Sequence, residues 1–462
     1  MTQACPSSRV SFFLLMLAAR IEAVFRMILR RPWQLLVIGL LVSLIGLGGA
    51  IAGFYVRAFS HLRAGRADLE RHHNAEALTH LQAYLRAWPD DSEALLLSAR
   101  ACWRLRQFDE AEHYLQKHQQ AGGPRDDFVR EFALIMAAQG AIDKAAEYCM
   151  PLLERKDAAA ALALEALVSG CTRQYRLAEA AAFLQRWLEI RPDDTQALLY
   201  QCHFDHMRGQ LEEAVPRYYH VLQLDPEHYS ARHQLAATLV ELRRFSEALS
   251  HLEMLQQCQA ANAQSLVLLA RCWDSLGRQA EAEQLLDQVL TKAPHDAAAL
   301  AARGQLALRR GQLADAEAWL GHALVHEPAN RQARYQLAQC LLQQGKMDEA
   351  QQQEQRLKQL EADEKRFYLI VTKEMSQRPQ DPALRHELGL IFLRSGEVEE
   401  GLRWLHEALR LGPTSVPLNQ TLAEYYQLTG DMERATYHRQ LVSLQTNGSV
   451  PNAPSPGGGP QR

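Results

Sequence analysis

The sequence AAALAARGQLALRRGQLADAEAWLGHALVHEPAN, at residues 297–330, predicts a hairpin of two short helices. Gly304 lies on the packing face of the first helix, where the absence of a side chain lets a partner helix approach closely. Gly311 is expected to end that helix, because glycine adopts the left-handed conformation at little cost. The second helix should place Ala316 where the two helices cross and should end before Pro328.

The same pattern recurs along the chain with a nearly constant period. Prolines follow five of the recurring alanines by twelve residues, and after a slip the phase returns at Gly401, Pro413 and Ala435. One interval is a residue longer than the others. The alanines, about 34 residues apart, are Ala77, Ala111, Ala145, Ala180, Ala214, Ala248, Ala282, Ala316 and Ala350.

This spacing resembles the tetratricopeptide repeat family, whose unit is a helix, a tight turn and a second helix. The resemblance covers roughly residues 58–445 as about eleven units. It implies an all-α fold, a right-handed superhelical solenoid of helix-turn-helix repeats, here preceded by one transmembrane helix. The chain departs from the family pattern at the first large position of each unit, where leucine replaces tryptophan, as at Leu95 and Leu300. Cys149 also stands where a large apolar residue is usual.

Residues 33–56 form an apolar stretch without a charged residue, long enough as a helix to cross a bilayer. We therefore predict a single-pass membrane protein, with the bacterial inner membrane as its expected location and lipid as a partner of this segment. The Arg30-Arg31 pair before the span favours repeats on the exported side. Two alternatives stay open. In the first, a signal peptidase cleaves the chain after Ala52 and releases the repeats. In the second, translation starts at Met27 in place of Met1.

The interval from Ala350 to Gly401 is one and a half periods long, which indicates an inserted helix or a junction between two sub-arrays, with a slightly degenerate extra hairpin as the alternative. It would be one continuous helix or two that bend near Ala362. The predicted segments are residues 1–32 (basic or amphipathic), 33–56 (transmembrane helix), 57–361 (about nine repeats), 362–380 (inserted helix or junction), 381–445 (a carboxyl-terminal pair of repeats) and 446–462 (a disordered tail rich in proline and glycine).

Three smaller features have a structural interpretation. A new apolar face is expected at the junction, formed by Phe367, Tyr368, Ile370 and Val371. The last helix turns polar from His438, as an end-capping helix should. Five cysteines late in first helices should face the core as small apolar residues: Cys102, Cys171, Cys202, Cys272 and Cys340.

The chain shows no motif for phosphate binding, zinc hydrolysis or nucleophilic catalysis, so we expect no enzyme activity and no cofactor. Its 50 Lys and Arg against 54 Asp and Glu argue against a nucleic-acid partner. His203 and His206 lie three residues apart, and His233 lies in the next unit. A metal site needs a third or fourth ligand, which the sequence does not show, so these histidines are interpreted as groove residues.

In the resembled family the first helices line a concave groove, which implies a protein or peptide partner. By that correspondence a mildly basic groove is predicted. We expect a membrane-tethered scaffold that binds protein partners or peptide segments for an envelope-associated complex. The alternative is a non-catalytic accessory subunit that presents substrates to a separately encoded envelope enzyme. The oligomeric state is not indicated. The predicted groove residues are Arg100, Arg104, Arg130, Arg173, His203, His206, His233, Arg271, Arg309, Tyr335, Gln339 and Arg394.

Overall fold

The computed structural model describes residues 32–155, 157–258 and 260–447. Within these ranges the chain forms helices joined by short turns, and no strand is present. Its contacts divide it into two compact units, Met1–Glu131 and Phe132–Arg462. Helix α6 (Arg125–Gln139) runs across the division, which the sequence analysis did not predict.

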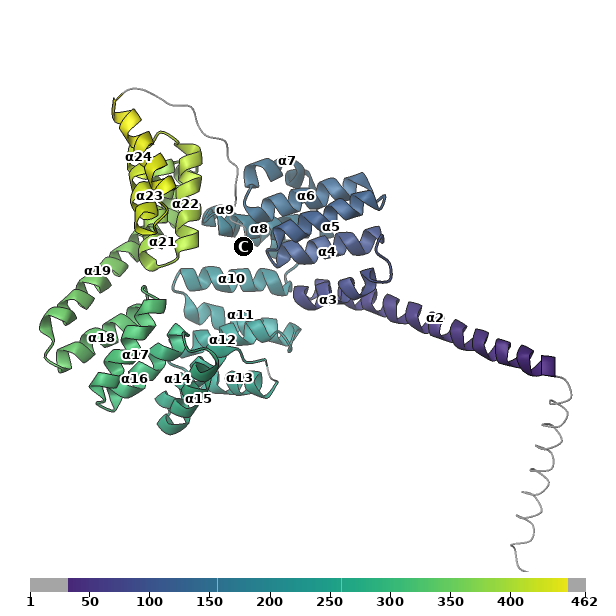
Figure 1. The fold of residues 1–462 in the computed structure, drawn as a ribbon, viewed down its shortest axis with the longest axis horizontal. Helices are drawn as coiled ribbons and strands as arrows, with labels where there is room; N and C mark the ends of the chain where they lie inside the picture. Colours follow the sequence, from purple (N-terminus) through teal and green to yellow (C-terminus); the bar gives the residue numbers. More distant parts are fainter. Residues whose placement is uncertain (1–31, 156, 259, 448–462) are drawn as a thin grey trace, which may run out of the picture. The chain divides into compact units, whose positions relative to one another are not determined.

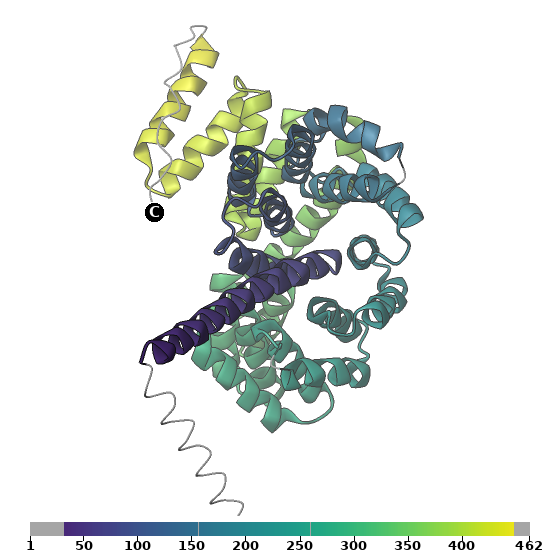
Figure 2. The same ribbon diagram turned by 90° about the vertical axis from the view of Figure 1, so that its right-hand side faces the viewer.

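Most helices pack against the next one in the chain, as the repeat pattern predicts (Figures 1 and 2). In the first unit they are α2 (Pro32–Glu70), α3 (Asn74–Leu85), α4 (Ser92–Arg104) and α5 (Phe108–Gln120). In the second unit they are α7 (Ile142–Leu153), α8 (Ala158–Arg173), α9 (Leu177–Ile190), α10 (Thr195–Met207), α11 (Leu211–Leu224), α12 (Tyr229–Glu241), α13 (Phe245–Gln257), α14 (Ala263–Ser275), α15 (Gln279–Lys292), α16 (Ala297–Arg309), α17 (Leu313–His326), α18 (Arg331–Gln343), α19 (Met347–Leu369), α20 (Met375–Gln377), α21 (Pro382–Ser395), α22 (Val398–Leu411), α23 (Val416–Leu428) and α24 (Met432–Asn447).

The periodic alanines occupy the helix crossings, which confirms their predicted packing role. All nine, and Ala435, have no exposed surface. At Gly304 a Cβ atom would lie 2.6 Å from Leu320 Cγ, so the expected close approach of the two helices is confirmed. The five cysteines expected in the core are also buried. Small side chains at these crossings let the helices of each pair approach closely enough to exclude water.

Local signals at the helix ends explain the regular hairpins. Several first helices begin at a capping side chain, as where Asp296 accepts a hydrogen bond of 2.8 Å from the Ala299 amide. Gly311 ends its helix with φ 71°, as predicted, and other turn glycines have positive φ as well. In four hairpins the same turn position holds a residue with a side chain: His72, Arg106, Tyr175 and Arg243.

Helix α2 contains the predicted span of residues 33–56 and continues beyond it to Glu70. Leu62 and Leu69, near its carboxyl end, are buried in a core cluster with Leu81 of α3. A search of the described part of the chain finds no helix with both the length and the apolar character needed to cross a membrane. The structure therefore does not support the predicted anchor. The amphipathic segment expected before it lies in residues 1–31, outside the described ranges.

At the junction, α19 is one continuous helix that passes residue 362 without a break and leads into a π-helical turn, Ile370–Glu374. The wider π turn shifts the helical phase, so that Ile370 and Val371 become buried. Phe367 packs against the same cluster. Tyr368, predicted for this apolar face, is instead 49% exposed. The limits predicted for the two sub-arrays stay predictions.

An aromatic cluster joins distant parts of the second unit. Tyr175, in the turn between α8 and α9, contacts the rings of Phe367 on α19, Phe392 on α21 and Trp404 on α22. Leu177 at the start of α9 packs on the same core. The contact closes helices α10 to α19 into a loop, which the sequence analysis did not predict.

The last helix differs from the prediction in two respects. His438 was expected on a polar capping face, but it is buried against Tyr426, with Nδ1 at 2.9 Å from Asn419 Oδ1. Helix α24 also extends to Asn447, two residues into the predicted tail. The rest of that tail, residues 448–462, lies outside the described ranges.

Candidate functional site

The first helices of successive repeats contact one another along one side of the second unit, since α12 meets α14, α14 meets α16 and α16 meets α18. Side chains bridge these neighbours. Arg309 on α16 donates to Asp274 on α14 at 2.7 Å. His206 on α10 lies 3.3 Å from Glu241 on α12. Two predicted groove residues therefore also join adjacent repeats.

A polar cavity of about 470 Å³ opens among the first helices of four successive repeats. Three arginines and two carboxylates line it, so its formal charges nearly balance. A ligand in this cavity would meet hydrogen-bond donors and acceptors together. The lining residues are Val240, Glu241, Arg243, Phe245, Arg271, Asp274, Ser275, Gln305, Arg309 and Gln332.

Arg271 is the most distinctive cation of the cavity. Its guanidinium forms no hydrogen bond or ion pair with the residues that the structure describes, although Glu241 is near enough to act on it through space. Burial lowers the pKa of Arg271 below its usual value, and the charge of Glu241 opposes that shift. A largely buried cation without a bonded partner favours an oxygen acceptor from a ligand.

Asp274 supplies the complementary acceptor. Its side chain is 7% exposed and Oδ2 accepts the bond from Arg309. Its other oxygen, Oδ1, is buried without a hydrogen-bond partner. Asp274 lies three residues after Arg271 on α14, which places both on one helix face. This face therefore presents an unpaired donor and an unpaired acceptor, as alternating carbonyl and amide groups of an extended peptide require.

The three predicted histidines do not form a cluster around a shared point. His206 pairs with Glu241, whereas His233 Nδ1 lies 2.8 Å from Ser265 Oγ, and burial lowers the pKa of His233. His203 is exposed. Among the described residues, no three histidine, cysteine, aspartate or glutamate side chains are grouped closely enough to hold a metal ion.

Tyr335 and Gln339, predicted for the groove, lie one turn apart on α18. Tyr335 is 53% exposed, and its hydroxyl accepts a hydrogen bond of 2.7 Å from Gln339 Nε2. Neither lines the cavity, whose contribution from α18 is Gln332. Tyr335 and Gln339 therefore extend the polar surface of α18 beyond the cavity.

Two predicted residues lie where the loop of helices closes. Arg394 donates two hydrogen bonds, of 2.8 and 2.7 Å, to the carboxylate of Asp363. Arg173 ends α8. Burial alone would raise the pKa of Glu400, but hydrogen bonding from Arg403 and the nearby charge of Arg173 lower it. These arginines support the junction and do not line the cavity.

The remaining three predicted residues belong to the first unit. Arg100 donates to both oxygens of Glu131, which is completely buried. Arg104 donates to the Leu69 carbonyl at 2.8 Å, and Arg130 pairs with Asp127 three residues away. Each contact stabilises its own unit.

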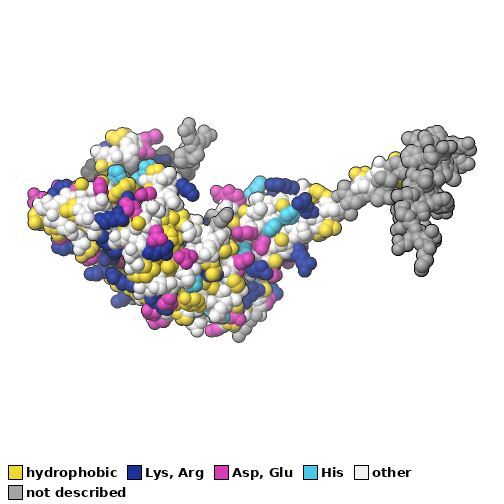
Figure 3. Space-filling view, turned by 90° about the horizontal axis from the view of Figure 1, so that it is seen from below, with side chains coloured by type: hydrophobic (Ala, Val, Ile, Leu, Met, Phe, Trp, Pro, Cys, Tyr) yellow, Lys and Arg dark blue, Asp and Glu magenta, His cyan; other side chains and the backbone are white. Residues whose placement is uncertain are grey.

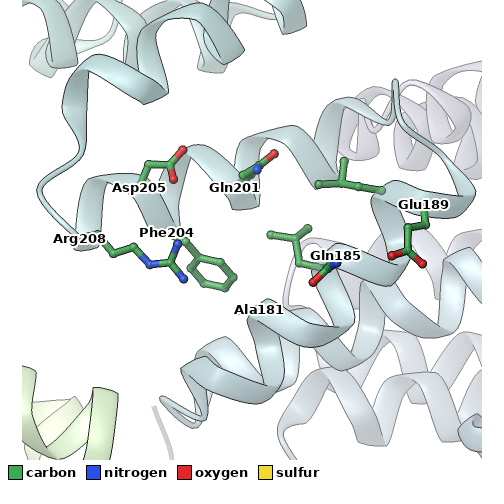
Figure 4. A pocket seen from close by; sticks show the side chains of 9 residues that line it. Ala181, Gln185, Glu189, Gln201, Phe204, Asp205 and Arg208 are labelled. Carbon is green, nitrogen blue, oxygen red and sulfur yellow. The ribbon is translucent and has the colours of Figure 1, made fainter.

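A second cavity, of about 490 Å³, separates α9 from α10. Leu184, Leu188 and Phe204 give it apolar walls, and Figure 4 shows the Phe204 ring between the two helices. Gln185, Gln201 and Arg208 supply polar groups. This gap lies immediately after the hairpin that carries Tyr175, so the repeat stack is loosely packed at this point.

Comparison with known proteins agrees with this architecture. A family model described as tetratricopeptide repeat matches residues 62–126 and 274–324. A second model with the same description matches residues 206–266 and 307–374. The chain therefore contains tetratricopeptide repeats, and the predicted all-α solenoid of helix-turn-helix units is confirmed.

The individual relatives are distant or match in part. Anaphase-promoting complex subunit 7 of Homo sapiens is 27% identical over 164 residues, which are 35% of this chain and 29% of that protein. Interferon-induced protein with tetratricopeptide repeats 3 of Mus musculus is 33% identical over 95 residues, 20% of this chain and 23% of that protein. The chain thus spans less than a third of either relative. The crystal structure of a thermophilic tetratricopeptide repeat protein of Thermus thermophilus, TTC0263, is 22% identical, with a TM-score of 0.33 and coverage of 43% of this chain and 99% of that one.

Sequence reasoning missed the acidic half of the cavity. Selecting basic and aromatic side chains included Arg271 and Arg309 but left out Asp274 and Glu241. The available signal was the spacing, because Asp274 follows Arg271 by three residues on a predicted first helix. That Arg271 lacks a bonded partner while Arg309 has one depends on side-chain packing between repeats.

Proposed function

We propose that this protein is a non-catalytic scaffold that binds extended segments of partner proteins along helices α12 to α18. The observation that carries the proposal is the cavity where Arg271 offers an unpaired donor and Asp274 an unpaired acceptor one helical turn away. An extended peptide satisfies both, since its main chain carries acceptors and donors at short intervals.

The charges around the cavity also favour a peptide over a nucleic acid. Arg309 is neutralised by Asp274, and Glu241 lies near Arg271, so the cavity lacks the excess of positive charge that phosphate binding uses. The face of the molecule in Figure 3 likewise has basic and acidic side chains intermixed. We infer a partner segment of mixed polarity with at least one carboxylate or carbonyl for Arg271.

The proposal includes membrane tethering through residues 33–56 and a role in an envelope-associated complex, with the repeats on the exported side. The support is the apolar sequence without a charged residue. Leu40, Leu44 and Leu47 of α2 are also more than half exposed, as a segment that meets lipid or an apolar partner requires. Fusing alkaline phosphatase after Gln445 tests the orientation, and an inactive fusion with full expression would contradict export.

A photo-crosslinking amino acid tests the groove directly. Placed at Gln305 in the cavity it should crosslink a partner in cells, whereas placed at Gln256, exposed on second helix α13, it should not. Adding Arg271→Gln should weaken binding at least about tenfold, because a charge-assisted hydrogen bond contributes about 1.5–3 kcal/mol. Equal crosslinking at both sites, unchanged by Arg271→Gln, would overturn the proposal.

The identity of the crosslinked partner also decides between the two forms of this function. A structural partner supports the scaffold. A captured envelope enzyme whose substrate also crosslinks at Gln305 would instead support an accessory subunit that presents substrates. Asp274→Asn offers a second variant for either case, since it keeps the shape of the side chain and removes its charge.

A further inference from the structure

The turn between α8 and α9 contains a residue in an unfavourable backbone conformation. Tyr175 has φ 54°, in the left-handed region that a bulky side chain disfavours. The corresponding turns after α10 and α14 have Gly209 and Gly277, with φ 71° and 85°. Three other turns share this conformation with a side chain present, so what distinguishes Tyr175 is the contact that its ring makes.

That contact is with three aromatic rings from the far side of the junction. The Tyr175 ring centroid lies 5.2 Å from Phe367 in an edge-to-face arrangement, 6.1 Å from Phe392 and 5.8 Å from Trp404. These separations are typical of favourable aromatic pairs. A single turn residue therefore connects α8–α9 to α19, α21 and α22.

The receiving rings belong to the core of the carboxyl-terminal repeats. Trp404 has no exposed surface, its Nε1 donates to Glu400 at 3.1 Å, and the Arg403 guanidinium lies 4.4 Å from its ring centroid. Phe392 packs in the same cluster with Leu388. Trp404 and Phe392 are thus held in place by their own repeat, and Tyr175 reaches them from another, where Leu177 packs on the same cluster.

Next to the turn that carries Tyr175, the packing is incomplete. A cavity of about 260 Å³ lies between Leu177 and Phe204 on one side and Tyr368 and Thr372 on the other. It shares Ala181, Phe204 and Arg208 with the cavity between α9 and α10 shown in Figure 4. Protein interiors are normally close-packed, so the Tyr175 contact has fewer supporting neighbours on the side of this cavity.

We propose that Tyr175 is a reversible latch. Seated against Phe367, Phe392 and Trp404, its ring closes helices α10 to α19 into a loop; withdrawn, it opens the loop and joins the two cavities. Opening breaks no helix, because the turn remains and the receiving rings keep their own core contacts. The latch is a property of the chain itself and does not depend on what the cavity near Arg271 binds.

Distance measurements on the full chain test the latch. Spin labels on ketone-bearing amino acids at exposed Ala182 of α9 and exposed Lys365 of α19 report closure without using the native cysteines. Tyr175→Gly suits the turn and removes the ring, so the distance distribution should move to longer values and broaden. Tyr175→Phe should keep the short distance. Arg106→Gly, at the same turn position in the first unit, should leave it unchanged.

Two further measurements complete the test. Tyr175→Asn, which also tolerates the left-handed region, replaces the glycine variant if that variant fails to fold by circular dichroism. In the unmodified chain, the distance distribution should contain a minor component at the longer distance that dominates in Tyr175→Gly, because a reversible latch populates the open form. A folded Tyr175 variant with an unchanged distance distribution, or an unmodified chain without the longer component, would overturn the proposal.

Discussion

The ring of Tyr175 lies 5.8 Å from that of Trp404, although helices α9 to α21 separate the two residues in the chain. A repeat array normally has contacts between neighbouring units alone, so its stability is nearly a sum of local terms. The contact between Tyr175 and Trp404 adds a long-range contribution to the stability of the second unit. Substitutions in the α8–α9 turn should therefore affect helices of the carboxyl-terminal repeats.

Tyr175→Ala should be less stable than Tyr175→Gly by about 1 kcal/mol, although alanine is the larger residue. Both lose the ring contacts, but alanine keeps the penalty of the left-handed conformation and glycine does not. Urea unfolding of the two variants measures the difference. The reverse order would show that the turn relaxes to negative φ when the ring is absent.

The effect of replacing a helical glycine with alanine should depend on how much space surrounds the new Cβ atom. Gly304→Ala should lower the free energy of unfolding by about 1–3 kcal/mol, because its Cβ would lie 2.6 Å from Leu320 Cγ. Gly170→Ala should cost more, since its Cβ would lie 1.8 Å from the Ala137 carbonyl oxygen, which is backbone. Gly321→Ala is the control, with no atom within 4 Å, and should stabilise by up to about 1 kcal/mol.

Glu131→Gln should destabilise the first unit by about 3–5 kcal/mol at neutral pH, because Arg100 would lose its charged partner. Burial alone would raise the pKa of Glu131, but Arg100 and the hydrogen bonds from Arg100 and Trp103 lower it. A lowered folded pKa gives stability that is present above the unfolded pKa and lost as the pH falls through the folded value. The difference between wild type and variant in chemical unfolding should therefore shrink only below about pH 4.3. A difference that disappears by pH 6 would contradict this assignment.

Acidification should loosen the last hairpin, α23–α24. Burial lowers the pKa of His438, and the nearby His406 and Arg434 act in the same direction; burial also lowers the pKa of His406. Stability from such groups is present above the unfolded histidine pKa, about 6.5, and is lost as the pH falls. Between pH 7.5 and 5.5 the free energy of opening of the hairpin should therefore fall. Hydrogen exchange, corrected for intrinsic rates, measures this free energy of opening at each pH. The double variant His406→Gln, His438→Gln should remove most of its pH dependence.

Much of the fold follows from local rules that can be read in the sequence. The alanine period predicted the helix crossings, and Gly304 and Gly311 predicted a close approach and a turn, because each depends on a few neighbouring residues. The candidate site was predicted less completely. Arg271 and Arg309 look equivalent as groove arginines, yet one is paired and the other is not, since pairing depends on which side chain of the adjacent repeat reaches the guanidinium.

The amino-acid sequence by itself determined that this protein is a stack of helical hairpins, because a small residue at each crossing and a turn signal at each end act within one repeat. Tertiary structure decided which polar side chains were already bonded to the next repeat, and that Tyr175 meets Phe367, Phe392 and Trp404. Those contacts depend on small rotations between repeats that accumulate over many helices, and no local pattern encodes their sum.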